Sequence, residues 1–255
     1  MRMMRRLYQL ETEVATQPSL VAGAPKVASL RHTFEQQLAA LQDDILRMGS
    51  YVSQMLVVAM QAVSKQDPRM SFHVIEMDDT ADFMDLQIEH TCLRLLALQQ
   101  PMSRDLRVIG TAFKVITDLE RIGDYAVDIA KTARRLASEP YLIPLTDLDR
   151  MATATEWMVR ECIHAYVEHD LDLVTQVVAR DDEVDDCYDR LFTDLLDRME
   201  RDRSLIRQGT WILGIARFLE RIADHAVNVA ERVHYVETGE LKQLHQDRPN
   251  NDHRP

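Results

Sequence analysis

Apolar residues recur three and four positions apart through most of the chain, which is the spacing of one face of an α-helix. The first long run comprises Leu38, Leu41, Ile45, Met48, Val52, Met55, Ala59 and Ala62. Only 7 glycines and 8 prolines occur in 255 residues, so few residues interrupt such helices. The pattern predicts an all-α protein whose helices bury their apolar faces in bundles.

Prolines and turn residues divide this pattern into segments. The predicted helices of the first half run from Arg31 to a turn at Gln66–Asp67, from Pro68 to about Gln99, and from about Ser103 to Ser138. Pro140 and Pro144 then mark a linker. Three more helices are expected after the linker, because His169–Asp170 matches the first turn at an offset of 103 residues.

Four parts follow from this division. We expect a mobile extension at residues 1–30, with one short helix near Leu7 to Val14, and a disordered tail at residues 241–255. Between them lie a first antiparallel three-helix bundle at residues 31–139 and a second at residues 140–240.

One stretch of twelve residues occurs twice, as LERIGDYAVDIA at positions 119–130 and as LERIADHAVNVA at positions 219–230. Eight of the twelve positions are identical, at a constant offset of 100 residues. A repeat of this kind predicts that the two halves share one architecture.

Composition narrows the class of protein. The formal net charge of −12 argues against nucleic acid as a partner, because phosphate binding requires a basic surface. Three unclustered cysteines imply neither a disulfide framework nor a thiolate metal site. No apolar run reaches the roughly 18 residues of a spanning helix, and acidic residues interrupt any signal sequence, so we expect a cytoplasmic protein.

The repeated stretch places acidic residues on or beside an apolar helix face: Glu120 and Asp124 in the first copy, and Glu220 and Asp224 in the second. A buried carboxylate requires a cation, a hydrogen-bond donor or a raised pKa. Each of these acids therefore needs a partner.

One helix earlier, further acids occur one turn apart in both halves. Asp78 and Asp82 are matched by Asp181 and Asp185, although Tyr188 and Phe192 replace the following Asp85 and Glu89. Like charges at this spacing destabilise a free helix, so a pair present in both halves suggests a shared cation. The candidate ligands form a first acidic set (Asp78, Asp82, Glu120 and Asp124) and a second acidic set (Asp181, Asp185, Glu220 and Asp224). Ligand sets made only of oxygen suit hard cations such as Mg²⁺, Mn²⁺ or Fe³⁺.

Arginines offer a competing account of the same acids. Six of them recur between the halves and could neutralise the carboxylates in ion pairs: Arg47, Arg107, Arg121, Arg150, Arg207 and Arg221. Helical periodicity does not show which helices face each other, so metal binding and internal ion pairing both remain open. His225 replaces Tyr125 in the second copy, and is either a surface residue or a supplementary ligand.

Two Glu-x-x-His segments fit the spacing of carboxylate-bridged di-iron bundles, Glu161 to His164 and Glu231 to His234. Neither recurs in the opposite half. Because such sites are normally built by internal symmetry, we interpret both as coincidence. No nucleophilic triad, glycine-rich phosphate loop or cysteine-based zinc site is found in the sequence.

The residues that precede and include the repeat resemble the PhoU family of phosphate-regulon accessory proteins. The resemblance is carried by QPMSRDLR at positions 100–107 with DLERIGD at 118–124, and by FLERIADH at 218–225 followed by Tyr235 and Gly239. It extends over about residues 31 to 240. It implies two three-helix bundles related by pseudo-twofold symmetry, no catalytic activity, no organic cofactor, and commonly a homodimer.

The resemblance also implies a function and a ligand. Members restrain phosphate-starvation signalling by coupling a phosphate ABC transporter to a membrane histidine kinase, so peripheral membrane association through these partners is expected. Some bind multinuclear metal clusters, here of Fe, Zn, Mn or Mg, through the acidic motifs, with Asp128 extending the first motif. Asn228 replaces the matching acid of the second motif, so a smaller second cluster is expected. The alternative function is a di-iron oxidase or metal-storage bundle, with metal held between four helices by His164 or His234.

Overall fold

The structure, a computed structural model, describes residues 27–99 and 101–244. In these ranges it contains six α-helices, one short 3-10 helix (η1) and no β-strand, which confirms the expected all-α architecture. The elements are α2 (Val27–Lys65), α3 (Pro68–Gln99), α4 (Ser103–Leu136), α5 (Thr146–Glu168), α6 (Leu171–Arg201), η1 (Arg203–Leu205) and α7 (Ile206–Thr238). The short helix expected near Leu7 to Val14 and most of the expected tail lie outside the described residues.

The chain divides into two units, Met1–Gln36 and Gln37–Pro255. Of the first unit the structure describes only the beginning of α2, which starts at Val27 rather than at the expected Arg31. There the guanidinium of Arg31 pairs with Glu35 (Nε to Oε1, 3.0 Å) and lies over the Phe34 ring. All other helices belong to the second unit, together with α2 from Gln37 onward.

The two halves use the same turn between their first and second helices. Gln66 and His169 both adopt a left-handed backbone conformation, with φ of 50° and 55°. In both turns an aspartate follows whose Oδ1 accepts from the backbone N–H two residues on: Asp67 from Arg69 and Asp170 from Asp172, each at 2.9 Å. The aspartate carboxylate thus satisfies a free N–H at the start of the next helix, and the predicted offset of 103 residues is reproduced.

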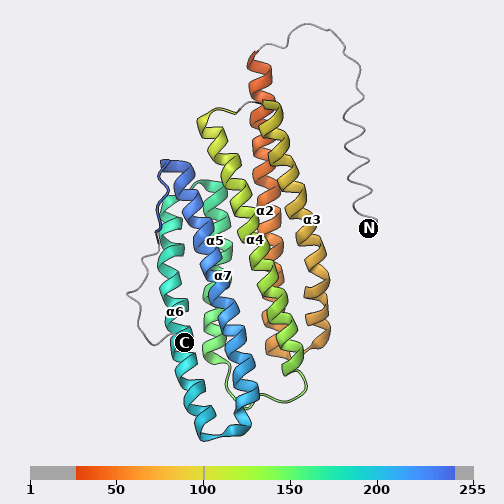
Figure 1. The fold of residues 1–255 in the computed structure, drawn as a ribbon, viewed down its shortest axis with the longest axis vertical. Helices are drawn as coiled ribbons and strands as arrows, with labels where there is room; N and C mark the ends of the chain where they lie inside the picture. Colours follow the sequence, from red (N-terminus) through yellow and green to blue (C-terminus); the bar gives the residue numbers. More distant parts are fainter. Residues whose placement is uncertain (1–26, 100, 245–255) are drawn as a thin grey trace. The chain divides into compact units, whose positions relative to one another are not determined.

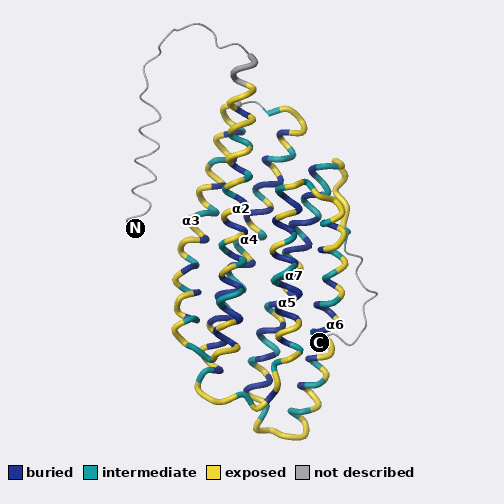
Figure 2. The backbone as a smooth tube through the Cα atoms, turned by 180° about the vertical axis from the view of Figure 1, so that it is seen from behind, coloured by how far each residue is buried: buried dark blue, intermediate teal, exposed yellow. Residues whose placement is uncertain are grey.

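Within the second unit, α2, α3 and α4 pack against one another, and so do α5, α6 and α7 (Figure 1). The hydroxyl of Tyr51 on α2 donates to the carbonyl of Met77 on α3 (3.3 Å). Gly123 of α4 faces α2, where a methyl group at this position would lie 3.6 Å from Val52. The apolar stripes predicted from the sequence are the buried sides of these helices (Figure 2).

The two bundles contact each other through α4 and α7, the helices that carry the repeated stretch. They also contact each other through α2 and α5, where Gly49 lies against Ile163 so closely that an added Cβ would come within 2.5 Å of its Cδ1 atom. The helices from Gln37 onward therefore form one compact unit, and the division at residues 139 and 140 stays an interpretation of the repeat.

No helix in the described part of the chain combines the length and the apolar character needed to cross a membrane. The linker between α4 and α5 contains Pro140 and Pro144, as predicted. It is held by Gln208, whose side-chain carbonyl accepts from the N–H of Leu142 (2.7 Å) and whose amide donates to the carbonyl of Pro140 (3.2 Å).

Candidate functional site

The first acidic set lies along neighbouring helices, with Asp78 and Asp82 on α3 and Glu120 and Asp124 on α4. Burial raises the pKa of Asp78, and the charges of Asp82 and Asp124 raise it further. Burial likewise raises the pKa of Glu120, with additional contributions from Asp124 and from acids of α3. The four carboxylates of this set thus lie close enough to influence one another electrostatically, and their role as ligands of a cation stays a prediction.

Two cations flank the first acidic set. Arg121 contacts both repeated acids, with Nε 3.5 Å from Glu120 and Nη1 3.2 Å from Asp124. Lys131 lies 3.4 Å from Asp128, the acid that extends the motif by one turn, and its charge also lowers the pKa of Asp78. The side chain of Glu120 is 30% exposed, so solvent and ions reach this set.

The second acidic set differs in burial. Asp181 and Asp185 of α6 and Glu220 of α7 are buried, and Asp224 of α7 is exposed. The side chain of Glu220 is only 8% exposed, and both of its oxygens accept from Nη1 of Arg217, at 2.6 Å for Oε1. A guanidinium therefore already occupies the position that a metal ion would take beside Glu220.

The ion pairs expected for the arginines are confirmed for Arg121, and three other arginines of that group also have contacts elsewhere. Arg121 pairs with the repeated acids as expected, but the equivalent Arg221 lies over the ring of Tyr125 (5.6 Å). Arg47 pairs with Asp44, and Arg207 pairs with Glu139. Arg217 was missed, although its position three residues before Glu220 is a signal that the sequence contains.

The repeated stretches meet across the α4–α7 contact. The ring of Tyr125 stacks on Phe218 at 5.9 Å, and Nδ1 of His225 lies 2.8 Å from Oδ1 of Asp118. At the offset of 100 residues, Tyr125 corresponds to His225 and Phe218 corresponds to Asp118. The offset therefore converts the first contact into the second. Contacts related by a twofold axis behave in this way, and the pseudo-twofold symmetry implied by the resemblance is present here.

His225 is partly exposed, with 21% of its side chain accessible, and its ring also takes part in the contact between α4 and α7. Asn228 donates from Nδ2 to the same Asp118 oxygen (3.4 Å). An aspartate at position 228 would place a second carboxylate beside Asp118, which is a physical reason for the missing acid of the second motif.

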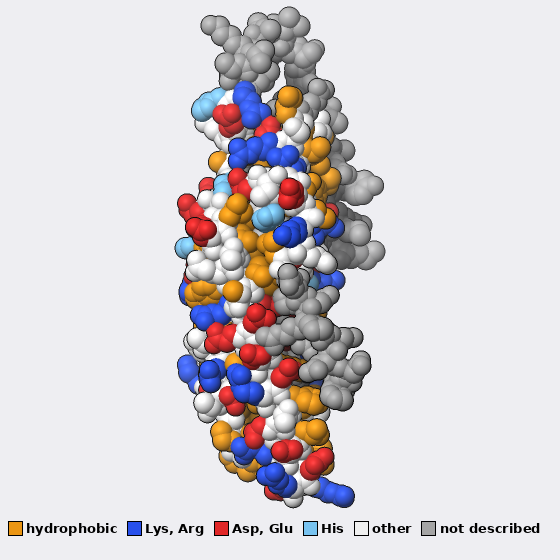
Figure 3. Space-filling view, turned by 90° about the vertical axis from the view of Figure 1, so that its left-hand side faces the viewer, with side chains coloured by type: hydrophobic (Ala, Val, Ile, Leu, Met, Phe, Trp, Pro, Cys, Tyr) orange, Lys and Arg blue, Asp and Glu red, His pale blue; other side chains and the backbone are white. Residues whose placement is uncertain are grey.

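No three Asp, Glu, His or Cys side chains converge into a ready metal site in residues 27–99 and 101–244. On the face drawn in Figure 3, acidic side chains are scattered among basic ones along the molecule. The di-iron alternative requires His164 in a helix core, but this side chain is 61% exposed and lies 3.9 Å from Glu161. His164 therefore does not lie where the di-iron alternative needs a ligand.

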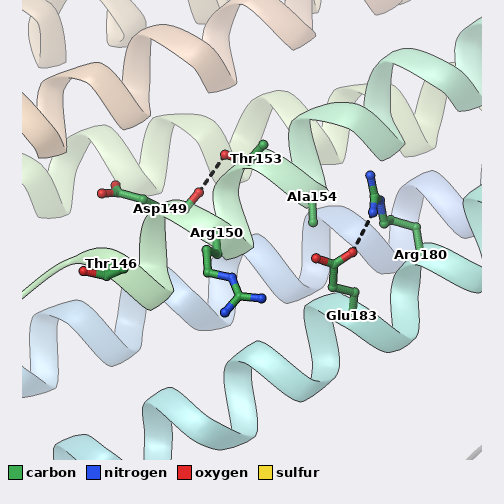
Figure 4. A pocket seen from close by; sticks show the side chains of 7 residues that line it. All are labelled: Thr146, Asp149, Arg150, Thr153, Ala154, Arg180 and Glu183. Atoms are coloured by element: carbon green, nitrogen blue, oxygen red, sulfur yellow. Dashed lines mark hydrogen bonds and ion pairs between the residues drawn. The ribbon is translucent and has the colours of Figure 1, made fainter.

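The second bundle also contains a cavity of about 380 Å³ between α5 and α6 (Figure 4). Arg150 of α5 lies beside it, and Arg180 of α6 pairs with Glu183 of the same helix (Nη1 to Oε2, 2.6 Å). Opposite charges line this cavity together, so it shows no preference for an anion or a cation.

The fold and the site together define a class of protein, which has six helices in tandem and carboxylates repeated on α4 and α7. The sequence matches the PhoU domain twice, at residues 45–133 and 148–233, and the chain belongs to the PhoU family. Each match contains one copy of the repeated stretch.

Curated relatives and solved structures agree with this assignment. Two proteins named phosphate-specific transport system accessory protein PhoU homolog are similar to the chain. The Clostridium acetobutylicum protein is 41% identical over 84% of this chain and 98% of its own length. The Caulobacter vibrioides protein is 35% identical over 86% of this chain and 95% of its own length.

Two crystal structures share the fold. PhoU from Pseudomonas aeruginosa has a TM-score of 0.79 and 33% identity, covering 81% of this chain and all of that one. The phosphate transport system regulatory protein PhoU from Streptococcus pneumoniae has a TM-score of 0.77 and 31% identity, covering 83% of this chain and all of that one.

Proposed function

We propose that this protein is an accessory regulator of a phosphate-specific transport system. In this role it restrains phosphate uptake and phosphate-starvation signalling by coupling a phosphate ABC transporter to a membrane histidine kinase. The observation that carries the proposal is the double PhoU match, which includes both repeated stretches. It is supported by relatives that bear this functional name and that match over 98% and 95% of their own length. The protein acts by binding its partners and not by catalysis, from the cytoplasmic side of the membrane.

One feature of α3 supports a role in protein–protein contact. Phe83, Leu86 and Leu93 are all about half exposed and are spaced three and seven residues apart, so they lie along one side of the helix. The matching positions of α6 are Asp186, Asp189 and Leu196, which are mostly polar. We assign the apolar side of α3 to a second copy of the chain, in a homodimer. Light scattering of Leu86→Lys should then give a monomer; an unchanged mass would refute the assignment.

The metal proposal concerns the two acidic sets. Their donors are carboxylate oxygens, a ligand type that fits Mg²⁺, Mn²⁺, Fe³⁺ and, with less preference, Zn²⁺. The first acidic set is the more open one, and a cation there would take the place of the Arg121 guanidinium between Glu120 and Asp124. The second acidic set, with Glu220 bound to Arg217 and Asn228 in place of an acid, is expected to bind metal more weakly.

Deleting the gene and measuring a phosphate-starvation reporter in high phosphate tests the regulatory role. The expected result is a reporter that stays on, and that is switched off again when the wild-type gene is supplied on a plasmid. Normal repression in the clean deletion would refute the proposal. A variant of a solvent-exposed position such as Asp79→Asn serves as the matched control and should repress like wild type.

A further inference from the structure

A second cavity, of about 280 Å³, opens between α4 and α7 and has an unusual lining. Three basic side chains face it, Arg107 and Lys114 from α4 and Arg232 from α7. The remaining lining residues are uncharged: Leu106, Gly110, Thr111 and Tyr235. No acidic side chain lines this cavity, and no ion pair within the described residues involves any of its three cations. Three positive charges thus converge in a protein whose net charge is −12.

Polar atoms in this cavity lack the partners that buried groups normally have. The Nε atoms of Arg107 and Arg232 and the Oγ1 atom of Thr111 are buried, and none has a hydrogen-bond partner among the described residues. Thr111 itself is only 2% exposed. A buried donor without a hydrogen-bond partner raises the free energy of the folded state. An arginine stays protonated, so it keeps its donors in every case. Three buried polar atoms in one cavity are therefore best satisfied by the oxygens of a ligand.

The internal repeat provides a comparison within the same molecule. At the offset of 100 residues, Thr111 corresponds to Trp211, and the guanidinium of Arg135 covers the Trp211 ring at 4.4 Å. Arg207, the counterpart of Arg107, pairs with Glu139 (3.3 Å). The equivalent region of the other half is thus occupied by an indole ring, and its arginines have partners. The open basic cavity is therefore a property of one half and is not imposed by the fold.

We propose that this cavity binds a phosphate group, either as inorganic phosphate or as the end of a small phosphate ester. A phosphate dianion matches several converging cations in charge, and its oxygens can accept from two guanidinium groups and a hydroxyl at once. A carboxylate has fewer oxygens and a single charge, so it would leave donors unsatisfied. The proposal stands on the cavity alone and does not need the regulatory role proposed above.

Isothermal titration calorimetry on the full chain tests the assignment, with inorganic phosphate and glycerol phosphate as ligands and with acetate as the anion control. We expect stoichiometric binding of at least one phosphate compound, with acetate weaker because a carboxylate has fewer oxygens and a single charge. Arg232→Gln should weaken binding about tenfold or more, because one charge-assisted interaction is lost. The control Arg207→Gln removes the counterpart of Arg107 in the other half and should bind like wild type.

Thr111→Trp copies the residue of the second half into the cavity and should abolish binding by filling it. If this variant does not fold, as judged by circular dichroism, Lys114→Gln replaces it, because Lys114 is exposed and its change should weaken binding without unfolding the protein. Binding of phosphate alone, or of the ester alone, decides which source supplies the group. No binding up to about 10 mM, acetate binding as tight as phosphate, or equal loss in Arg207→Gln would each overturn the proposal. These outcomes leave the reporter experiment unaffected, so the two proposals fail separately.

Discussion

His225 and Asp118 form a direct contact between the two halves of the protein, with Nδ1 2.8 Å from Oδ1. A carboxylate only accepts hydrogen bonds, so the ring proton lies on Nδ1. The same Asp118 oxygen accepts from Asn228. One acid of α4 is thus satisfied by two side chains of α7, and both belong to the repeated stretch.

This contact predicts the effect of restoring the acid of the second motif. Asn228→Asp removes a donor to Asp118 and places a second carboxylate beside it, so the free energy of unfolding should fall by at least roughly 1 kcal/mol at pH 7. Urea denaturation measures this change. The reciprocal control Asp128→Asn loses only an exposed pair with Lys131 and should change stability by less than about 0.5 kcal/mol. Equal effects of the two variants would contradict the explanation.

The pair of Arg217 with Glu220 predicts opposite effects at matching positions. Arg217→Gln leaves a buried carboxylate without its guanidinium and should lower the free energy of unfolding by about 1–3 kcal/mol. Thr117→Arg introduces an arginine three residues before Glu120, where the first half has none, and should raise stability by about 0.3 kcal/mol. Thermal unfolding of both variants in the presence of chelator measures these changes. Loss of stability in both variants would show that an arginine three residues before Glu120 does not stabilise the first half.

The acids of the first set predict a dependence of stability on pH. Because the pKa of Glu120 is raised above its ordinary value of 4.5, the folded state binds more protons than the unfolded state in the window just above 4.5. Ionisation of Glu120 therefore lowers the free energy of unfolding as the pH rises through the pKa of this residue in the folded state. This decrease is fully present at pH 7. Glu120→Gln should be more stable than wild type at pH 7, and the difference should vanish as the pH falls towards 4.5. A difference that grows on acidification would mean that the sign is wrong.

The contact between Gly49 and Ile163 predicts that α2 and α5 tolerate no side chain at this position. Gly49→Ala brings a methyl group into Ile163, whose Cγ1 atom would lie 2.8 Å away, so stability should fall by about 1–3 kcal/mol. Gly214→Ala is the control, because nothing lies within 4 Å of its added Cβ. Since alanine favours helix, this control should gain about 0.5–1 kcal/mol. Calorimetry of both variants checks the prediction.

The metal proposal predicts unequal binding by the two acidic sets. Elemental analysis of protein purified without chelator should find metal in the wild type, less in Asp224→Ala, and least in Asp124→Ala, because the first acidic set is the more open one. Asp79→Ala, which removes an exposed acid, should keep the wild-type content. A wild-type protein that is free of metal, and that also fails to bind Fe, Mn, Mg and Zn on titration, would exclude the acids as ligands and leave Arg121 as their partner.

Much of the architecture could be predicted from local pattern. The start of α3 at Pro68, its end at Gln99 and the start of α4 at Ser103 agree with the expected positions. Proline, turn residues and helical periodicity are local signals, so they act before any tertiary contact forms. Val27, the start of α2, was not predicted, because the residues before Arg31 show weak periodicity.

The candidate site was predictable only in part. Asp78, Asp82, Glu120 and Asp124 influence one another electrostatically because α3 and α4 are neighbours, and their role as ligands of a cation stays a prediction. Arg217, whose guanidinium pairs with Glu220, was not among the arginines expected from the repeat, because Thr117 stands at the matching position of the first half. The basic cavity of Arg107, Lys114 and Arg232 had no signal in the sequence, as its residues come from α4 and α7 at a separation of more than one hundred positions.

The sequence by itself determined the helices, the repeated architecture of the two halves and the membership of the PhoU family, because periodicity and repetition depend only on the order of the residues. Only the tertiary structure decided that Asp118 meets His225, that Trp211 occupies the place where Thr111 leaves a cavity, and that Arg217 neutralises Glu220. These relationships depend on the rotation and axial register of one helix against another, which arise from the packing of whole side-chain surfaces and not from the order of residues in either helix.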